Sequence, residues 1–288
     1  MNSIIANDIF LTLKSENIRE YLNKLLILMD ELDKHRFKIK THEDIWLFKD
    51  NDEYFYDWLY SKNPPELVDL KTEFYKRIER AVPIKLEEYN NYESKLDKSI
   101  TKYCDYNDQF LFINNDDNDE IHIISSLLSF YHLRRWYLEK CVNQKEFVKD
   151  LPLLFPNLHF HKNLISTLRT LNNDFNIIRP EIVAHLTALE LFHQSGEIHY
   201  SDSNTVKCKK FEAFSRINCS TENKRKQASK LSFVYSNNDA TRKINCECHT
   251  KFNTFGKDRT KQDRIYFSFG QKGCLDEKII IYHIGNHI

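Results

Sequence analysis

Glycine is absent from the first 195 residues of the chain, and proline is absent from everything that follows them. The glycines are Gly196, Gly256, Gly270, Gly273 and Gly285. Tight turns between antiparallel strands depend on glycine, because it adopts backbone angles that other residues avoid. The long first part therefore favours helices joined by polar or proline-marked bends, and hairpins are expected only after Gly196.

The chain also lacks an apolar run of bilayer length, and its first residues lack the basic and apolar regions of a secretory signal. Its seven cysteines follow no regular spacing, so they favour reduced thiols over a disulfide framework. These absences predict a soluble, cytoplasmic protein with no membrane partner.

Net charge is absent as well, since 42 basic side chains balance 42 acidic ones. The charges are unevenly spread: residues 196–288 hold 17 Lys and Arg against 10 Asp and Glu, whereas residues 1–195 hold 25 against 32. A basic part attracts polyanions, which makes RNA the expected partner. An acidic part can repel the same polyanion or dock on the basic surface.

Helical periodicity runs through the first part of the chain. Apolar residues share one helix face over 18–32 and again over 67–78, where "NPPE" places proline in the first turn. A third apolar segment covers about 121–141, and "RPEIVAHLTALELFHQSG" has proline near its start and glycine as its stop. We therefore expect a helical N-terminal domain over residues 1–150, which would regulate the protein or bind a protein partner or inhibitor.

Beyond Gly196 the apolar period changes to two. Four segments rich in β-branched and aromatic residues are expected to be strands, namely 231–235, 244–252, 264–269 and 278–284. Short turns between them favour an antiparallel sheet. The predicted fold class is α+β, in which the helical domain precedes a module of residues 151–288 with a few helices and a terminal antiparallel sheet.

Two of these strands have a polar face, because side chains alternate across a strand. In 244–252 this face carries His249 and Lys251, and in the next strand it carries Arg264 and Tyr266. Cysteine, isoleucine and phenylalanine occupy the opposite faces and are expected in a core. If the two strands pair, the four polar residues share one exposed surface, on which Tyr266 would donate a hydrogen bond or stack on a base.

This set of side chains suits metal-independent cleavage of an RNA phosphodiester. One group takes the proton of the ribose 2′-hydroxyl while another protonates the leaving 5′-oxygen, and histidine can fill either role near neutral pH. His249 is expected in one role, and His283 or His287 in the other. Lys251 and Arg264 would stabilise the charge on the phosphorane. The region has no dense acidic cluster, so neither a metal ion nor another cofactor is expected.

The ending "RIYFSFG…KIIIYHIGN" resembles the end of RelE/HigB-type mRNA interferase toxins, in which an Arg-headed strand, a turn and a His-closed strand complete a small sheet. By position, Arg264 matches the Arg that opens the penultimate strand, and His283 matches the His that closes the last. His249 and Lys251 fall where those toxins often carry a functional Arg or Lys. The resemblance covers about the last 45 to 60 residues. It implies an endoribonuclease acting as a toxin or antiviral defence effector.

The chain departs from that pattern in two ways. "GNHI" replaces the expected Lys-rich tail, which leaves open which group is the general acid or base. The helical part is also far longer than in a stand-alone toxin, which implies an enzyme held in check or positioned by its own N-terminal domain. "FPNLHFHKNLISTL", "EIVAHLTALELF" and the ending are further similar to parts of one bacterial protein family, so residues 152–288 are expected to form one module.

A basic run lies just before the expected strands. It contains Lys224, Arg225, Lys226 and Lys230. Such a run is usually a solvated turn, but beside a phosphate-handling face it becomes a candidate patch for binding the nucleic-acid backbone.

Two other interpretations remain open. Cys246, Cys248, His283 and His287 supply four acceptable zinc ligands, as in a zinc-stabilised nucleic-acid-binding domain, although alternation places both cysteines on the apolar face. Alternatively, the module is a non-catalytic nucleic-acid-binding or assembly subunit of a bacterial defence complex, and its basic face binds nucleic acid or an acidic protein.

Overall fold

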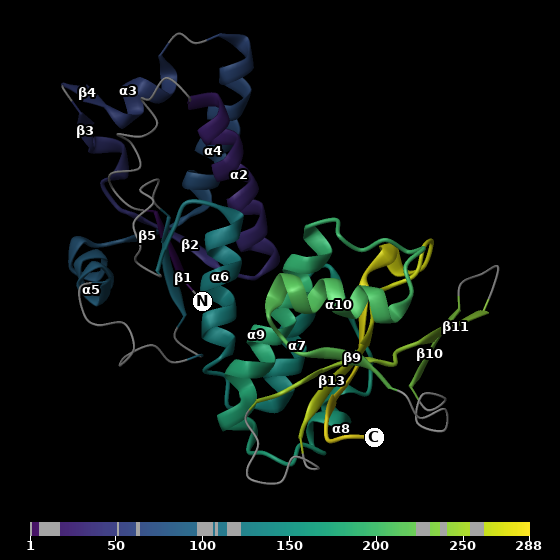
Figure 1. Ribbon diagram of the computed structural model, residues 1–288. Coiled ribbons are helices and arrows are strands. Elements are labelled where there is room, and N and C mark those ends of the chain that lie inside the picture. The colour runs from purple at the N-terminus through teal and green to yellow at the C-terminus, as the bar shows by residue number, and fades with distance from the viewer. Residues whose placement is uncertain are drawn as a thin grey trace. The chain divides into compact units, whose positions relative to one another are not determined.

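The chain divides into two compact units, residues 1–137 and 138–288, each described here by itself (Figure 1). The computed structural model describes residues 2–5, 18–50, 52–61, 64–96, 106, 109–113, 122–222, 231–236, 241–253 and 262–288. As predicted, the fold is of the α+β class, with a helical N-terminal region and a C-terminal antiparallel sheet. The division lies before Gln144–Leu154 (α7), whereas the sequence placed it after Asp150; α7 packs on elements of the second unit.

The helices of unit 1 flank a five-stranded parallel sheet, which the sequence did not indicate. Its strands are β1 (Asn2–Ile5), β2 (Lys38–His42), β5 (Val82–Ile84), β6 (Phe110–Ile113) and β7 (Ile123–Ile124). They lie in the order β5-β2-β1-β6-β7, and every neighbouring pair is parallel. Parallel strands are joined by helices and need no tight glycine turn, so a glycine-free stretch is compatible with this sheet.

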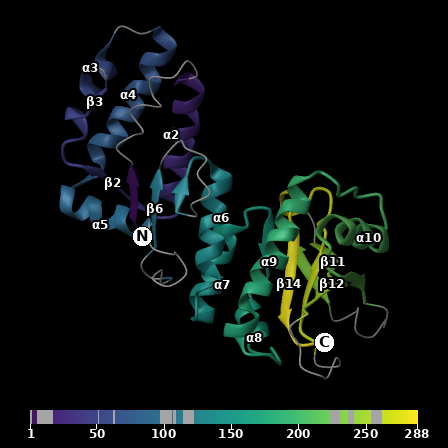
Figure 2. The same cartoon turned by 60° about the vertical axis from the view of Figure 1, so that its left-hand side comes forward.

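Helices cover both faces of that sheet (Figures 1 and 2). The helices are α2 (Ile18–Lys34), α3 (Phe55–Tyr60), α4 (Pro65–Arg80), α5 (Leu86–Leu96) and α6 (Leu127–Leu138). The stripes expected over 18–32 and 67–78 form the buried faces of α2 and α4, which pack on Ile5, Leu111 and Ile113. Tyr89 of α5 packs on the other face of the sheet. A two-stranded hairpin, β3 (Lys49–Asp50) and β4 (Glu53–Tyr54), and the short 3-10 helix η1 (Ile45–Leu47) precede α3.

Unit 2 is built on a second five-stranded sheet in the order β8-β14-β13-β12-β9. The strands are β8 (Leu158–Phe160), β9 (Cys219–Thr221), β12 (Cys248–Lys251), β13 (Arg264–Ser268) and β14 (Ile279–Gly285). The sheet is antiparallel from β14 to β9, as expected, and β8 adds a parallel strand at its edge.

The segment 244–252, expected as one strand, is two strands in different sheets. Its first part belongs to β11 (Thr241–Asn245), which pairs with β10 (Ser232–Ser236) in a separate hairpin, and its second part is β12. The break falls at Cys246 and Glu247. There the Cys246 amide donates to the Leu231 carbonyl at 2.7 Å, and the Glu247 carbonyl accepts from the Glu222 amide at 2.9 Å, so both residues pair outside a continuous ladder.

One face of this sheet packs on helices. Unit 2 contains α7, α8 (Leu164–Leu168), α9 (Phe175–Gln194) and α10 (Asn204–Ser215), with the 3-10 helix η4 (Leu275–Glu277) before β14. α9 is the helix expected to end at Gly196, and that glycine has a left-handed φ of 74°. Phe192 of α9 and Phe211 of α10 contact the ring of Phe269 beyond β13, with ring centroids 5.9 and 6.4 Å apart.

No helix within the described ranges is both long and apolar enough to cross a lipid bilayer.

Candidate functional site

Strand pairing brings the four polar residues of the expected face together. In the register of β12 and β13, His249 pairs with Tyr266 and Lys251 pairs with Arg264. Paired residues point to the same face of a sheet, so the four side chains share one face. β14 continues the row, because His283 pairs with Tyr266.

This polar face is buried, whereas the sequence placed it on an exposed surface. The neighbouring residue Thr250 points to α9, where its hydroxyl lies 3.0 Å from His185 Nδ1, so His249 faces away from α9. Even so, His249 is only 3% exposed and Tyr266 is fully buried. The chain's last residues account for the difference, because they fold back across this face toward Tyr266 and Glu222.

Arg264 is the centre of the cluster. Its Nη1 lies 3.4 Å from His249 Nε2 and donates to the Tyr266 hydroxyl at 3.2 Å. The same nitrogen lies 3.6 Å from Glu222 Oε2, whose side chain is largely buried. The Nε–H of Arg264 is also buried, and among the described residues it has no hydrogen-bond acceptor. Arg264 therefore joins the histidine, the phenol and the carboxylate, and it retains one unpaired donor.

His249 is held as a neutral imidazole whose Nε2 is the acceptor nitrogen. Arginine only donates, so the contact with Arg264 identifies Nε2 as the acceptor nitrogen. Nδ1 then carries the proton and points to the Glu247 carbonyl at 3.4 Å. Burial, followed by the charge of Arg264, lowers the pKa of His249 to about 4. The Ser220 hydroxyl lies 3.1 Å from the same Nε2 and can donate to it.

The two C-terminal histidines, His283 and His287, lie in different environments. His287 reaches the cluster, with Nε2 3.4 Å from Glu222 Oε2, so one carboxylate stands between Arg264 and His287. His283 lies edge-on to Tyr266, with ring centroids 5.7 Å apart, and its Nε2 donates to the Asn286 carbonyl at 3.0 Å. Burial lowers the pKa of His283. His283 therefore holds the turn that carries His287, and its Nε2 proton is already used.

The C-terminal turn is fixed against α8. The amide of Ile284 donates to Thr167 Oγ1 at 3.2 Å, and the amide of Asn286 donates to Thr170 Oγ1 at 3.3 Å. Gly285 is needed for this approach, because a Cβ at that position would lie 2.5 Å from the Thr167 carbonyl oxygen. The structure thus shows that "HIGNHI" turns back toward the polar face.

Lys251 lies beside the cluster and lines a cavity of about 510 Å³. The cavity is lined by Glu212, Asn218, Cys219, Ser220, Lys251, Asn253 and Gln262. Ser220 belongs to both the cavity and the cluster, since its hydroxyl contacts His249. A ligand in the cavity would therefore lie beside the Nε2 lone pair of His249.

The four residues of the zinc alternative lie in separate environments. Cys246 packs with Cys274 and Ile280, whereas Cys248 is buried with Cys208 and Cys219 on the helix-facing side of the sheet. Contact with Cys208 and burial raise the pKa of the Cys248 thiol. Across the described ranges, no group of three or more His, Cys, Asp or Glu side chains is placed to hold a metal ion.

The expected backbone-binding patch, Lys224, Arg225, Lys226 and Lys230, lies outside the described residues. It follows directly in sequence after Glu222 and Asn223, at the end of β9.

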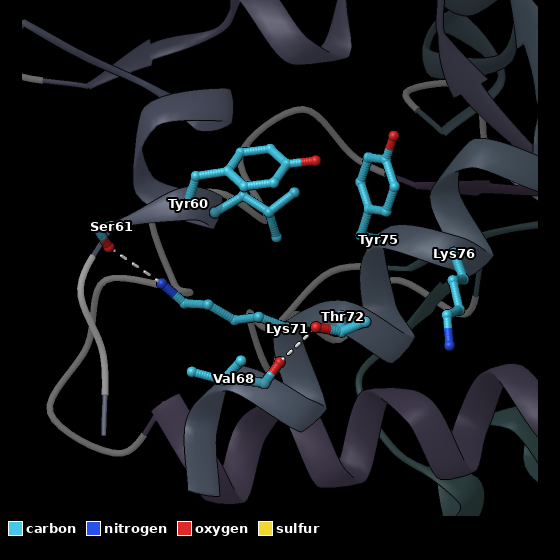
Figure 3. Close-up of a pocket in the computed structure, with 8 residues that line it drawn as sticks. Tyr60, Ser61, Val68, Lys71, Thr72, Tyr75 and Lys76 are labelled. Carbon is cyan, nitrogen blue, oxygen red and sulfur yellow. Dashed lines mark hydrogen bonds between the residues drawn. The ribbon is translucent and has the colours of Figure 1, made fainter. Parts of the chain in front are cut away.

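A second cavity, of about 710 Å³, lies in unit 1 between α3 and α4 (Figure 3). Lys71 extends along its wall, and its Nζ donates to the Trp58 carbonyl at 2.6 Å and to Ser61 Oγ at 3.4 Å. Burial lowers the pKa of Lys71 to about 8. The Trp58 carbonyl, in the last turn of α3, also accepts from the Ser61 amide and hydroxyl, so Lys71 adds a further donor to this helix end. The contacts thus assign Lys71 a structural role.

Sequence reasoning missed Ser220 and Glu222 as members of the cluster. Ser220 belongs to the three-residue strand β9, which pairs with β12 across a long stretch of chain, and Glu222 directly follows that strand. Neither belongs to a recognisable motif; the pairing of Ser220 with His249, and the contacts of Glu222 with Arg264 and His287, reveal them. Comparison of the chain with protein-family models, with curated proteins and with solved structures found no match.

Proposed function

We propose that unit 2 is a metal-independent endoribonuclease, in keeping with the resemblance of its ending to RelE/HigB-type toxins. The observation that carries the proposal is the convergence of His249, Arg264 and His287 through Glu222. In-line cleavage by the 2′-hydroxyl requires a base, an acid and a fixed cation around one phosphate. These side chains supply one of each. The protein would act in the cytoplasm as a toxin or defence effector, under the control of unit 1.

Each residue then has a role that follows from its contacts. Nε2 of His249, unprotonated at neutral pH, accepts the proton of the 2′-hydroxyl. Arg264 and Lys251 bind the phosphate oxygens, and one of those oxygens provides the acceptor that Arg264 Nε lacks. His287, held by Glu222, protonates the leaving 5′-oxygen. Tyr266 is too deeply buried to stack on a base and instead positions Arg264.

The test uses the full-length chain and a labelled RNA. Wild type should cleave in the presence of EDTA and leave 2′,3′-cyclic phosphate ends. Replacing both His249 and Arg264 by Ala should lower the rate by at least about 100-fold, because general acid–base catalysis alone contributes that much. His199→Ala, an exposed histidine of the same unit, is the matched control. Intact RNA with wild type, or equal cleavage by the double variant, would sink the proposal.

The burial of His249 and Tyr266 favours a second candidate, a non-catalytic nucleic-acid-binding or assembly subunit. A polar network closed by the chain's own residues can simply stabilise the sheet. This candidate predicts that the protein retards RNA in a gel without cutting it, and that the double variant binds as wild type does.

A further inference from the structure

The groups that line the cavity beside Lys251 restrict the kind of ligand that it can bind. Its wall is polar, and two of its lining groups can accept hydrogen bonds. Glu212 contributes a carboxylate from the last turn of α10. Gln262 contributes an amide group: one Nε2 hydrogen is donated to the Phe252 carbonyl at 2.6 Å, and its oxygen can accept from a ligand. Acceptors of this kind select a ligand that presents donors.

The size and the position of the cavity restrict the ligands that it could hold. A cavity of about 510 Å³ lies within the range that holds a compact organic ligand, such as one nucleoside. Lys251 stands at the side of the cavity toward Arg264, and Ser220 contacts His249. A nucleoside in the cavity would thus place its phosphate at the proposed cleavage site.

Among the four bases, guanine matches this wall best. Its Watson–Crick edge carries two adjacent donors, N1–H and N2–H₂, which one carboxylate can accept in parallel. Adenine and cytosine each offer a single amino group beside an acceptor, which a carboxylate would repel, and uracil offers one N–H between two carbonyls. We propose that this cavity binds the guanine base of an RNA nucleotide next to the cleaved phosphate, with Glu212 as the residue that determines specificity. The inference rests on the proposed function and names the substrate of the same site.

Binding and cleavage are measured separately on the full-length chain. The 3′-monophosphates of guanosine, adenosine, cytidine and uridine are titrated by calorimetry into wild type and Glu212→Gln. Wild type should bind the guanosine nucleotide at least about tenfold more tightly than the others, and Glu212→Gln should abolish that difference while leaving the affinity for inorganic phosphate unchanged. Glu197→Gln, an exposed glutamate outside the cavity, is the matched control and should keep the preference.

Equal affinity for the four nucleotides, or a guanosine preference that survives in Glu212→Gln, would overturn the inference. Sequencing of cleavage ends separates it from the proposed function. Cleavage without any base preference would support the proposed ribonuclease function and contradict the guanine site. If the chain leaves RNA intact but binds the guanosine nucleotide in a way that depends on Glu212, the guanine site is supported and the proposed ribonuclease function is contradicted.

Discussion

At the scale of single residues, the charges of Arg264 and Glu222 act in opposite directions on the pKa of His249, on the polar face of unit 2. The imidazole is buried, and a nearby guanidinium further disfavours its protonated form. Glu222 acts in the opposite direction, but more weakly. Burial and this arginine thus together keep the proposed base unprotonated, and the arginine also offers charge to a phosphate.

Replacing Arg264 by Gln should raise the pKa of His249 from about 4 toward the ordinary histidine value of 6.5. Glu222→Gln should lower it further, because a favourable charge is removed. Titration of the ring protons by NMR measures both shifts. His185 is an internal control, because burial also lowers its pKa to about 4 but Arg264 is not among the causes. An unchanged His249 titration in Arg264→Gln would show that burial alone sets this pKa.

Lys71 provides a residue-scale prediction in unit 1. Its pKa in the folded chain is about 8, below the ordinary value of 10.5, so the folded state disfavours its charged form. The contribution of Lys71 to the unfolding free energy should therefore rise as the pH increases from about 8 to 10.5 and be smallest below that window. Denaturant unfolding at several pH values should show this rise in wild type and a flatter profile in Lys71→Met. Lys76→Met, at an exposed position of the same helix, should keep the wild-type slope.

At the scale of elements, the fit between β14 and α8 positions the proposed acid. Gly285→Ala should lower the unfolding free energy of unit 2 by about 1–3 kcal/mol, the usual cost of overpacking. The added Cβ would collide with the Thr167 carbonyl and the Thr170 hydroxyl. Chemical denaturation measures the loss. Adding Thr170→Ala should restore part of it; if the double variant is no more stable than Gly285→Ala, the collision is not the cause.

The sequence anticipated the elements whose signals are local. The stripe of α2, the proline-led start of α4 and the glycine stop of α9 all lie within or directly beside the elements they define. The strands of unit 1 were missed because they are two to five residues long and their helical connections need no glycine. "FLFI" in β6, an apolar run between polar residues, was the one local signal.

The candidate site could be predicted only in part, because the sequence shows local patterns but not which distant segments meet. Alternation along β12 and β13 was enough to place His249 and Arg264 on one face. It could not show that the chain's end covers that face, because the cover depends on a turn held by side chains of α8. Ser220 and Glu222 were out of reach, because their pairing partner lies far along the chain.

At the scale of the whole molecule, charge follows the division into units. Unit 1 carries 19 Lys and Arg against 26 Asp and Glu, and unit 2 carries 23 against 16. Polyanion affinity should therefore reside in unit 2 and weaken with salt, because bound RNA releases counterions.

Replacing Lys224, Arg225, Lys226 and Lys230 by Gln tests the basic run directly. If each contacts a phosphate, the slope of log affinity against log salt should flatten by up to about 3 for a single-stranded RNA. Filter binding over a range of salt concentrations measures the slope. Exchanging the exposed Lys145 and Lys149 of α7 instead should leave it nearly unchanged. An unaltered slope in the fourfold variant would assign the run to an ordinary solvated turn.

The chain's three tryptophans, Trp46, Trp58 and Trp136, all belong to unit 1 and pack in or against its larger core. Indole emission excited near the red edge of protein absorption is therefore a reporter of unit 1 alone. Tyrosine emission and far-ultraviolet circular dichroism report on both units, because eleven of the fifteen tyrosines lie in unit 1 and both units contain helices. A substitution that disturbs unit 1 can thus be told from one that leaves unit 1 intact without cutting the chain.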